Sequence, residues 1–126
     1  MRQRTKQFAM RVVGLFKRLP KTDAARIIGK QVLRAGTSVA ANYRAVNRAR
    51  SKAEFIAKMG VVVGEADETV FWLEPLVETG IVDKTLMRRL LTEANELLAI
   101  FAASQSTAKN GNHSQKHQRS DVQMTQ

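Results

Sequence analysis

The stretch MRRLLTEANELLAIF, residues 87–101, decides the fold class of this chain. Its apolar residues recur at alternating steps of three and four, at Met87, Leu90, Ala94, Leu97 and Phe101. This spacing puts all five on one side of an α-helix and is typical of a seam between packed helices. The stretch therefore predicts an amphipathic helix that packs against other helices of the same chain.

Three earlier segments carry apolar stripes with the same helical spacing. The first segment has Phe8, Val12, Leu15, Phe16 and Leu19. The second has Ala24, Ile28, Val32, Ala35, Val39, Tyr43 and Val46. The third has Phe55, Met59, Val62, Ala66, Val70, Leu73 and Val77. No segment alternates with a period of two, so the sequence predicts four helices and no strands.

Helix-ending and helix-starting residues separate these four segments. Pro20 closes the first, and Thr22 is suited to cap the second. After a break at residues 47–50, Ser51 opens a capping box with Glu54. Gly80 ends the third segment, and Asp83 is suited to cap the fourth. Short connections favour opposite directions for consecutive helices, which predicts an all-α, antiparallel, up-down-up-down four-helix bundle over residues 1–108.

Residues 109–126 differ in composition from the bundle. Val122 and Met124 are their only sizeable apolar residues, so they have little to bury against the entropy cost of ordering. We expect them to form a disordered polar tail.

Composition excludes several classes of site. The chain has no cysteine, so it holds no disulfide or thiolate metal site. No run approaches the ~20 apolar residues of a membrane span, and we expect a cytoplasmic protein. Its two histidines, His113 and His117, both lie in the predicted tail, and no phosphate-binding loop or Ser–His pair is present. We therefore expect no enzyme activity, no cofactor and no metal ion.

The positive charge is concentrated in one part of the chain. The net charge is +10, yet residues 1–50 hold thirteen Lys and Arg against one acid, while residues 51–126 hold eight against ten. Five cations of the second helix form a stripe opposite its core face, with no acid between them: Arg26, Lys30, Arg34, Arg44 and Arg48. Along the first helix, three arginines recur every seven residues: Arg4, Arg11 and Arg18.

These eight residues are the predicted nucleic-acid-binding surface. Phosphate contacts need only such charges, without groups that read bases. Three alternatives stay open: a merely solvated face, a surface for an acidic protein partner on an interaction scaffold, and a first helix that lies on an anionic membrane.

The third helix is apolar on a second face, opposite its core stripe. A helix that is apolar all round is normally buried all round, which predicts a contact with another subunit. The predicted interface has Trp72 as its anchor and consists of Ala57, Gly60, Val61, Gly64, Glu68, Phe71 and Trp72. In the alternative, Phe71 and Trp72 only cover the edge of their own bundle.

A third group of residues flanks the core stripe of the second helix. Small residues such as Ala35 and Gly36 allow a neighbouring helix to come close. We expect three polar residues to form structural hydrogen bonds across that gap: Gln31, Ser38 and Asn42.

Two runs carry a family resemblance: QVLRAGTSVAAN, residues 31–42, and RSKAEFIAK, residues 50–58. Together with Gly64, Glu68 and residues 72–74, they resemble the four-helix bundle proteins also called 23S rRNA-intervening sequence proteins. The resemblance implies a homo-oligomeric ring, a pentamer, without enzymatic activity. It also implies partners, since related proteins bind nucleic acid and a reverse transcriptase. Our leading hypothesis is a non-enzymatic protein that associates with nucleic acid, RNA in preference to DNA.

Overall fold

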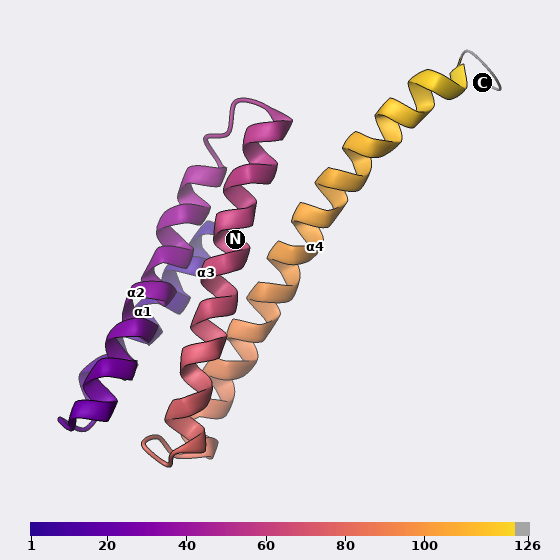
Figure 1. Ribbon diagram of the computed structural model, residues 1–126. Helices are drawn as coiled ribbons and strands as arrows, with labels where there is room; N and C mark the ends of the chain where they lie inside the picture. The colour runs from indigo at the N-terminus through magenta and orange to yellow at the C-terminus, as the bar shows by residue number, and fades with distance from the viewer. Residues whose placement is uncertain (123–126) are drawn as a thin grey trace.

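The chain folds into four helices, shown in a computed structural model that describes the backbone of residues 1–122 and the side chains of residues 1–111 (Figure 1). The helices are α1 (Arg2–Arg18), α2 (Asp23–Val46), α3 (Lys52–Glu78) and α4 (Lys84–Val122). No strand occurs in residues 1–122, so the predicted all-α class with four helices is confirmed. None of these four helices is long and apolar enough to cross a membrane.

The predicted cap residues accept hydrogen bonds at the helix starts, although the Glu54 carboxylate pairs with Lys58 and does not complete the predicted capping box. The hydroxyl of Thr22 accepts a hydrogen bond from the Ala25 amide at 3.3 Å, and that of Ser51 accepts from the Glu54 amide at 3.0 Å. The Asp83 carboxylate accepts from the Thr85 amide at 2.7 Å. After α3, Gly80 has a φ of +75°, a left-handed conformation that favours glycine and ends the helix.

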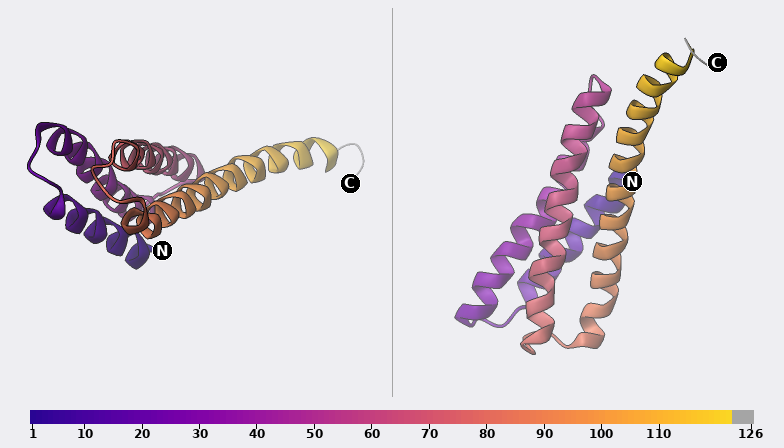
Figure 2. Two further views of the ribbon diagram at one scale, coloured as in Figure 1. Left: turned by 90° about the horizontal axis from the view of Figure 1, so that it is seen from below. Right: turned by 45° about the vertical axis from the view of Figure 1, so that its right-hand side comes forward.

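The core lies between helices that follow one another in the chain. The chain turns back at each connection, α2 lies beside both α1 and α3, and α4 lies beside α3 (Figures 1 and 2). All five residues of the predicted α4 seam are buried. The largest fully buried side chains are Phe8, Phe101, Leu73, Leu76, Met87 and Leu97.

The inward face of α2 differs from the predicted stripe at its start. Ala24 is exposed, and Ala25 is buried instead. The inward stripe continues through Gly29, Val32, Gly36 and Val39 at steps of three and four. Two glycines, which are easily overlooked in an apolar pattern, therefore define where α2 meets α1.

These glycines allow α1 to pack closely on α2. A methyl group at Gly36 would lie 2.9 Å and 3.0 Å from the two γ-carbons of Val12, well inside van der Waals contact. A methyl group at Gly29 would meet Leu19 and Phe16 at the other end of α1. The position of α1 against α2 thus depends on the absence of side chains at two residues.

α1 packs far less extensively on α4 than on α2. From Lys109 onward, the structure also departs from the predicted disordered tail: α4 continues as a helix to Val122 and stands out from the bundle (Figure 2). The segment contains no proline, and its one glycine, Gly111, lies within the helix and does not end it. Residues 123–126 lie outside the described part of the chain, and the division at residue 108 stays a prediction.

We expect Gly36→Ala to lower the free energy of unfolding. The added methyl group must displace Val12 or the whole of α1, and such overpacking costs about 1–3 kcal/mol, more than the ~1 kcal/mol that alanine gains as a helix former. Gly14→Ala is the matched control, because a methyl group at Gly14 meets no atom within 4 Å. Urea unfolding followed by circular dichroism should place the midpoint of Gly14→Ala above that of the wild type. A urea midpoint of Gly36→Ala as high as that of Gly14→Ala would contradict the close contact between Gly36 and Val12.

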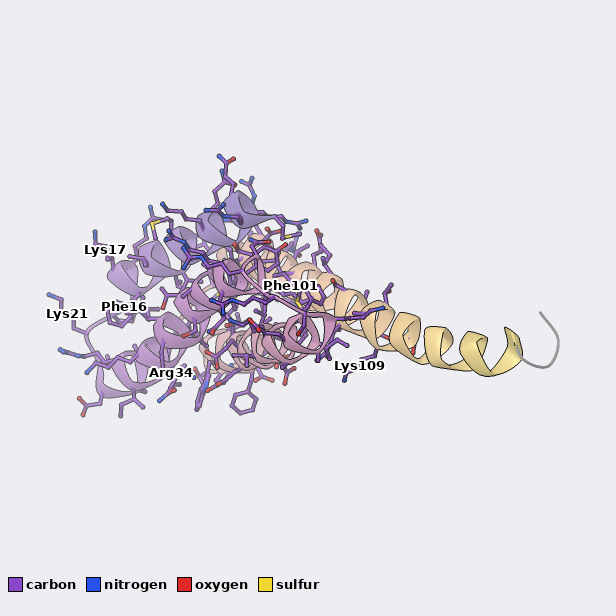
Figure 3. The ribbon with its side chains drawn as sticks, turned by 90° about the horizontal axis from the view of Figure 1, so that it is seen from above. Phe16, Lys17, Lys21, Arg34, Phe101 and Lys109 are labelled. Atoms are coloured by element: carbon purple, nitrogen blue, oxygen red, sulfur yellow. The ribbon has the colours of Figure 1, made fainter. Side chains whose placement is uncertain are left out.

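We expect deletion of residues 109–126 to leave the thermal midpoint nearly unchanged. The deleted segment is polar, and α4 leaves the bundle near Lys109, so its removal uncovers little of the core (Figure 3). Scanning calorimetry of the shortened chain and the full chain makes the comparison. A drop of many degrees would show that this segment packs against the rest of the protein.

Candidate nucleic-acid interface

The α2 cations of the predicted surface all lie in solvent, as do Arg11 and Arg18 of α1. Side chains with blue nitrogen ends stand out from the half of the molecule that α1 and α2 form, where Lys17 and Lys21 are labelled (Figure 3). The eight residues nevertheless do not form one continuous surface. Two are held by carboxylates, and the rest lie at separate places around α1 and α2.

Arg34 is the first exception to the prediction of an acid-free stripe. Its Nη1 donates to Glu65 Oε2 at 3.1 Å, and its Nη2 donates to Glu68 of the same helix, α3. The hydrogen bond to Glu68 raises the pKa of Arg34. The prediction that no acid neutralises this stripe is therefore wrong at its centre. It considered only the residues of α2, whereas the acids come from α3.

Arg4 is the second exception. Its Nε and Nη2 donate to both carboxylate oxygens of Glu93 at 2.8 Å, and Nη2 also donates to Glu96 at 2.9 Å. The hydrogen bond from Arg4 lowers the pKa of Glu93, so the pair is ionised at neutral pH. Both arginines connect helices, α1 to α4 and α2 to α3, and carboxylates of the same chain offset their charges.

A groove between α1 and α2 gathers cations from both helices. It has a volume of about 800 Å³, and Arg2, Lys6 and Arg44 line it together with small and uncharged residues, Thr37, Ala40 and Ala41 among them. No carboxylate and no aromatic ring lines it. We call it the α1/α2 groove. Arg2 and Lys6 are the residues that the sequence pattern missed, because neither belongs to the seven-residue repeat of α1.

The remaining predicted cations flank this groove or lie elsewhere. Arg48 follows Arg44 by one helical turn just after the end of α2, and Arg26 and Lys30 lie exposed near its start. Arg11 and Arg18 line a different groove, between α1 and α4. Among the ion pairs of residues 1–111, none involves these five residues.

The predicted interface on α3 is partly used within the chain. Ala57, Val61, Gly64 and Phe71 are exposed, as the prediction requires. Gly60, however, faces Gln105 of α4, Glu68 binds Arg34, and Trp72 packs partly buried against the core. Phe71, which is 57% exposed and meets Trp72 edge to face, is therefore the better candidate for an anchor.

The three predicted structural polar residues do not join helices within residues 1–111. The amide of Asn42 donates to the carbonyl of Ser38 in its own helix at 2.8 Å. No hydrogen bond to another helix forms at Gln31, Ser38 or Asn42 in that part of the chain. The close approach is made by Gly36 and Val12 instead, and it needs no polar bridge.

Metal-ligating groups do not cluster in the described part of the chain. No three His, Cys, Asp or Glu side chains within it gather so that they could hold an ion. The side chains of His113 and His117 lie outside the described ones. The candidate site is thus a surface of cations and helix faces, and the comparison with known proteins bears on such surfaces.

The family model of the 23S rRNA-intervening sequence protein matches residues 1–103. The chain belongs to this family. The match covers all of α1, α2 and α3 and most of the part of α4 that packs in the bundle, which confirms the resemblance carried by residues 31–42 and 50–58. No curated protein matches the chain.

A solved structure supports the family assignment. A protein of unknown function from the S23 ribosomal protein family of Bacteroides thetaiotaomicron is 32% identical to this chain. The alignment has a TM-score of 0.75 and covers 81% of this chain and 94% of that one. The family shares the fold over nearly the whole length of that protein.

The ion pair of Arg4 with Glu93 predicts a dependence of stability on pH. Arg4 holds the pKa of Glu93 below its ordinary value of 4.5, so the ionised carboxylate stabilises the fold at neutral pH, and this contribution is lost as the pH falls through the folded-state pKa. We expect Glu93→Gln to unfold at a lower urea concentration than the wild type at pH 7. The difference should disappear in acid. A difference that persists undiminished in acid would contradict this contribution of the ion pair.

Proposed function

We propose that this member of the 23S rRNA-intervening sequence protein family is a non-enzymatic protein that binds nucleic acid, RNA in preference to DNA, through the α1/α2 groove. The observation that carries this proposal is the meeting of Arg2, Lys6 and Arg44 in a groove without a carboxylate. Cations from two helices that face one opening attract a phosphate chain more strongly than the same charges dispersed over a surface. The family's name, which concerns ribosomal RNA, supports RNA as the ligand.

The shape of the groove favours contacts with the phosphate backbone over contacts with bases. The side chains between the cations are small, with Ala40 and Ala41 on the α2 side, so a nucleic-acid strand can approach the helix surface. The N-terminus of α1, with no acid in its first turn, adds the partial positive charge of a helix start. Without an aromatic ring to stack a base, binding should show little sequence preference.

We further propose that the chain is an antiparallel up-down-up-down bundle that assembles with copies of itself into a ring, as its family resemblance implies. The support is the apolar outer face of α3, where Val61 and Phe71 are 51% and 57% exposed. Exposed apolar faces on a single helix commonly mark contacts between subunits. Assembly would multiply the groove, and linked weak sites bind one strand far more tightly than a single site does.

The test is the salt dependence of binding to a labelled single-stranded RNA, measured by fluorescence anisotropy, with DNA of the same sequence for comparison. We expect replacement of Arg2, Lys6 and Arg44 by Gln to weaken binding at low salt. The log–log salt slope should fall by roughly 0.7 to 0.9 for each phosphate that is no longer neutralised. Replacement of Arg26, Lys30 and Arg48 should have a smaller effect, because those residues lie outside the groove.

The matched control removes three exposed cations from α4: Lys84, Arg88 and Lys109. It changes the net charge equally, so it should leave the slope unchanged if the groove is the site. Arg34→Gln should also leave binding unchanged, since Glu65 and Glu68 already hold that charge. No binding of RNA or DNA by the wild type at low salt would refute the proposal and favour an interaction scaffold with an acidic protein partner.

A further inference from the structure

A second groove lies on the other side of α1, between α1 and the start of α4. Its volume is about 480 Å³, and its floor is aliphatic, with Leu15, Leu19 and Leu90. Leu86, which also lines it, is 79% exposed, the most of any large apolar residue in the described part of the chain. We call it the α1/α4 groove. Its existence follows from the limited contact between these two helices.

The rim of the α1/α4 groove is basic. Arg11, Arg18 and Arg89 line it against a single acid, Asp83, whose carboxylate caps α4. None of the three arginines belongs to an ion pair within residues 1–111. An aliphatic floor with a cationic rim fits a helix that presents apolar side chains together with carboxylates. It fits nucleic acid poorly, since leucines would face a polar strand.

The outer face of α3 has this complementary character. Phe71 stands exposed at its centre, and Gly64 and Ala57 continue the apolar part toward the start of the helix. At roughly 100° per residue, three exposed acids fall within about 60° of Phe71 on one side: Asp67, Glu74 and Glu78. These acids form no ion pair in the described part of the chain. α3 therefore presents an apolar ridge with an acidic edge.

We propose that the outer face of α3 in one copy docks into the α1/α4 groove of the next copy. Phe71 packs on the leucine floor, and the acidic edge faces Arg11, Arg18 and Arg89. The inference rests on the self-assembly proposed above and names the two surfaces that make it. Both surfaces belong to every copy, so the contact runs head to tail and repeats into a closed ring or a filament.

The charges favour this pairing over a symmetric one. Two α3 faces packed on each other would bring six carboxylates together, and two α1/α4 grooves would bring six arginines together. Like charges at an interface disfavour a contact, whereas the head-to-tail pairing joins opposite charges. The two basic grooves differ in their lining: the α1/α2 groove has three cations and no acid among mostly small and polar residues, and the α1/α4 groove has a floor of leucines.

Two glycines provide blocking variants that spare the fold. Gly14 lines the α1/α4 groove, Gly64 lies two turns before Phe71 on α3, and a methyl group at either meets no atom within 4 Å in its own chain. Gly14→Gln and Gly64→Gln therefore place a larger, neutral, helix-favouring side chain on one surface each. Ala102→Gln, at an exposed residue of α4 that belongs to neither surface and lines neither groove, is the matched control.

Sedimentation velocity over a range of concentrations tests the proposal on the full-length chain. We expect the wild type and Ala102→Gln to assemble, and each blocked variant to need about tenfold or more higher concentration, as overpacking of an interface implies. An equimolar mixture of Gly14→Gln and Gly64→Gln should form dimers that neither forms alone. One unblocked groove then meets one unblocked α3 face, while the opposite ends stay blocked. Circular dichroism should show unchanged helicity in all variants.

Each other outcome overturns the proposal in a distinct way. If the wild type assembles but the mixture of the two variants stays monomeric, this docking is refuted and self-assembly is not. The same conclusion holds if the blocked variants assemble as readily as the wild type. A monomeric wild type at micromolar concentration would refute the proposed self-assembly along with the docking. In neither case is RNA binding by a single copy affected, because the α1/α2 groove is complete within one chain.

Discussion

The close contact of Gly36 with Val12 is the constraint on which the surfaces of this protein depend. A side chain at residue 36 would occupy the space of the Val12 γ-carbons, so α1 can pack this closely on α2 only because the residue there is glycine. Gly29 has the same role near Leu19. With α1 held by α2 at two points, its contact with α4 is left limited, and a groove forms on each side of it.

The two grooves flank the same helix but differ in chemistry. On the α2 side, α1 contributes Arg2 and Lys6 to a groove that no acid lines. On the α4 side, it contributes Leu15 and Leu19 to an aliphatic floor below a rim of arginines. In the proposed function, this helix of seventeen residues lines both the phosphate-binding groove and the groove that receives a neighbouring copy. Such a division lets a nucleic acid and a neighbouring subunit contact the same chain without competing for the same residues.

The acids of α3 and α4 determine which cations are available. Glu65 and Glu68 hold Arg34, and Glu93 and Glu96 hold Arg4, so two arginines join helices instead of meeting a ligand. The remaining exposed acids of α3 lie on its outer face, beside Phe71. The strong asymmetry of charge along the sequence therefore produces ion pairs inside the chain and a basic groove, and it makes the outer face of α3 opposite in charge to the rim of the α1/α4 groove.

The sequence by itself determined the elements of this fold. The three-four spacing of Met87 to Phe101, the caps at Thr22, Ser51 and Asp83, and Gly80 after α3 are all local features, and each was confirmed where predicted. The family likewise followed from residues 31–42 and 50–58. The sequence also indicated which surfaces are basic or apolar, since helical periodicity assigns residues to the faces of a single helix.

Only the tertiary structure decided how those faces are combined. The rotation and separation of neighbouring helices bring Arg34 to two acids of α3 and place Lys6 in one groove with Arg44. They also turn Trp72 inward and leave Phe71 exposed. The rotation and separation of two helices are set by how their side chains interlock. At Gly36 it is the lack of a side chain that lets α1 and α2 come this close. A periodic pattern shows which face of a helix is apolar, but which residue of another helix that face will meet is a property of the packed structure.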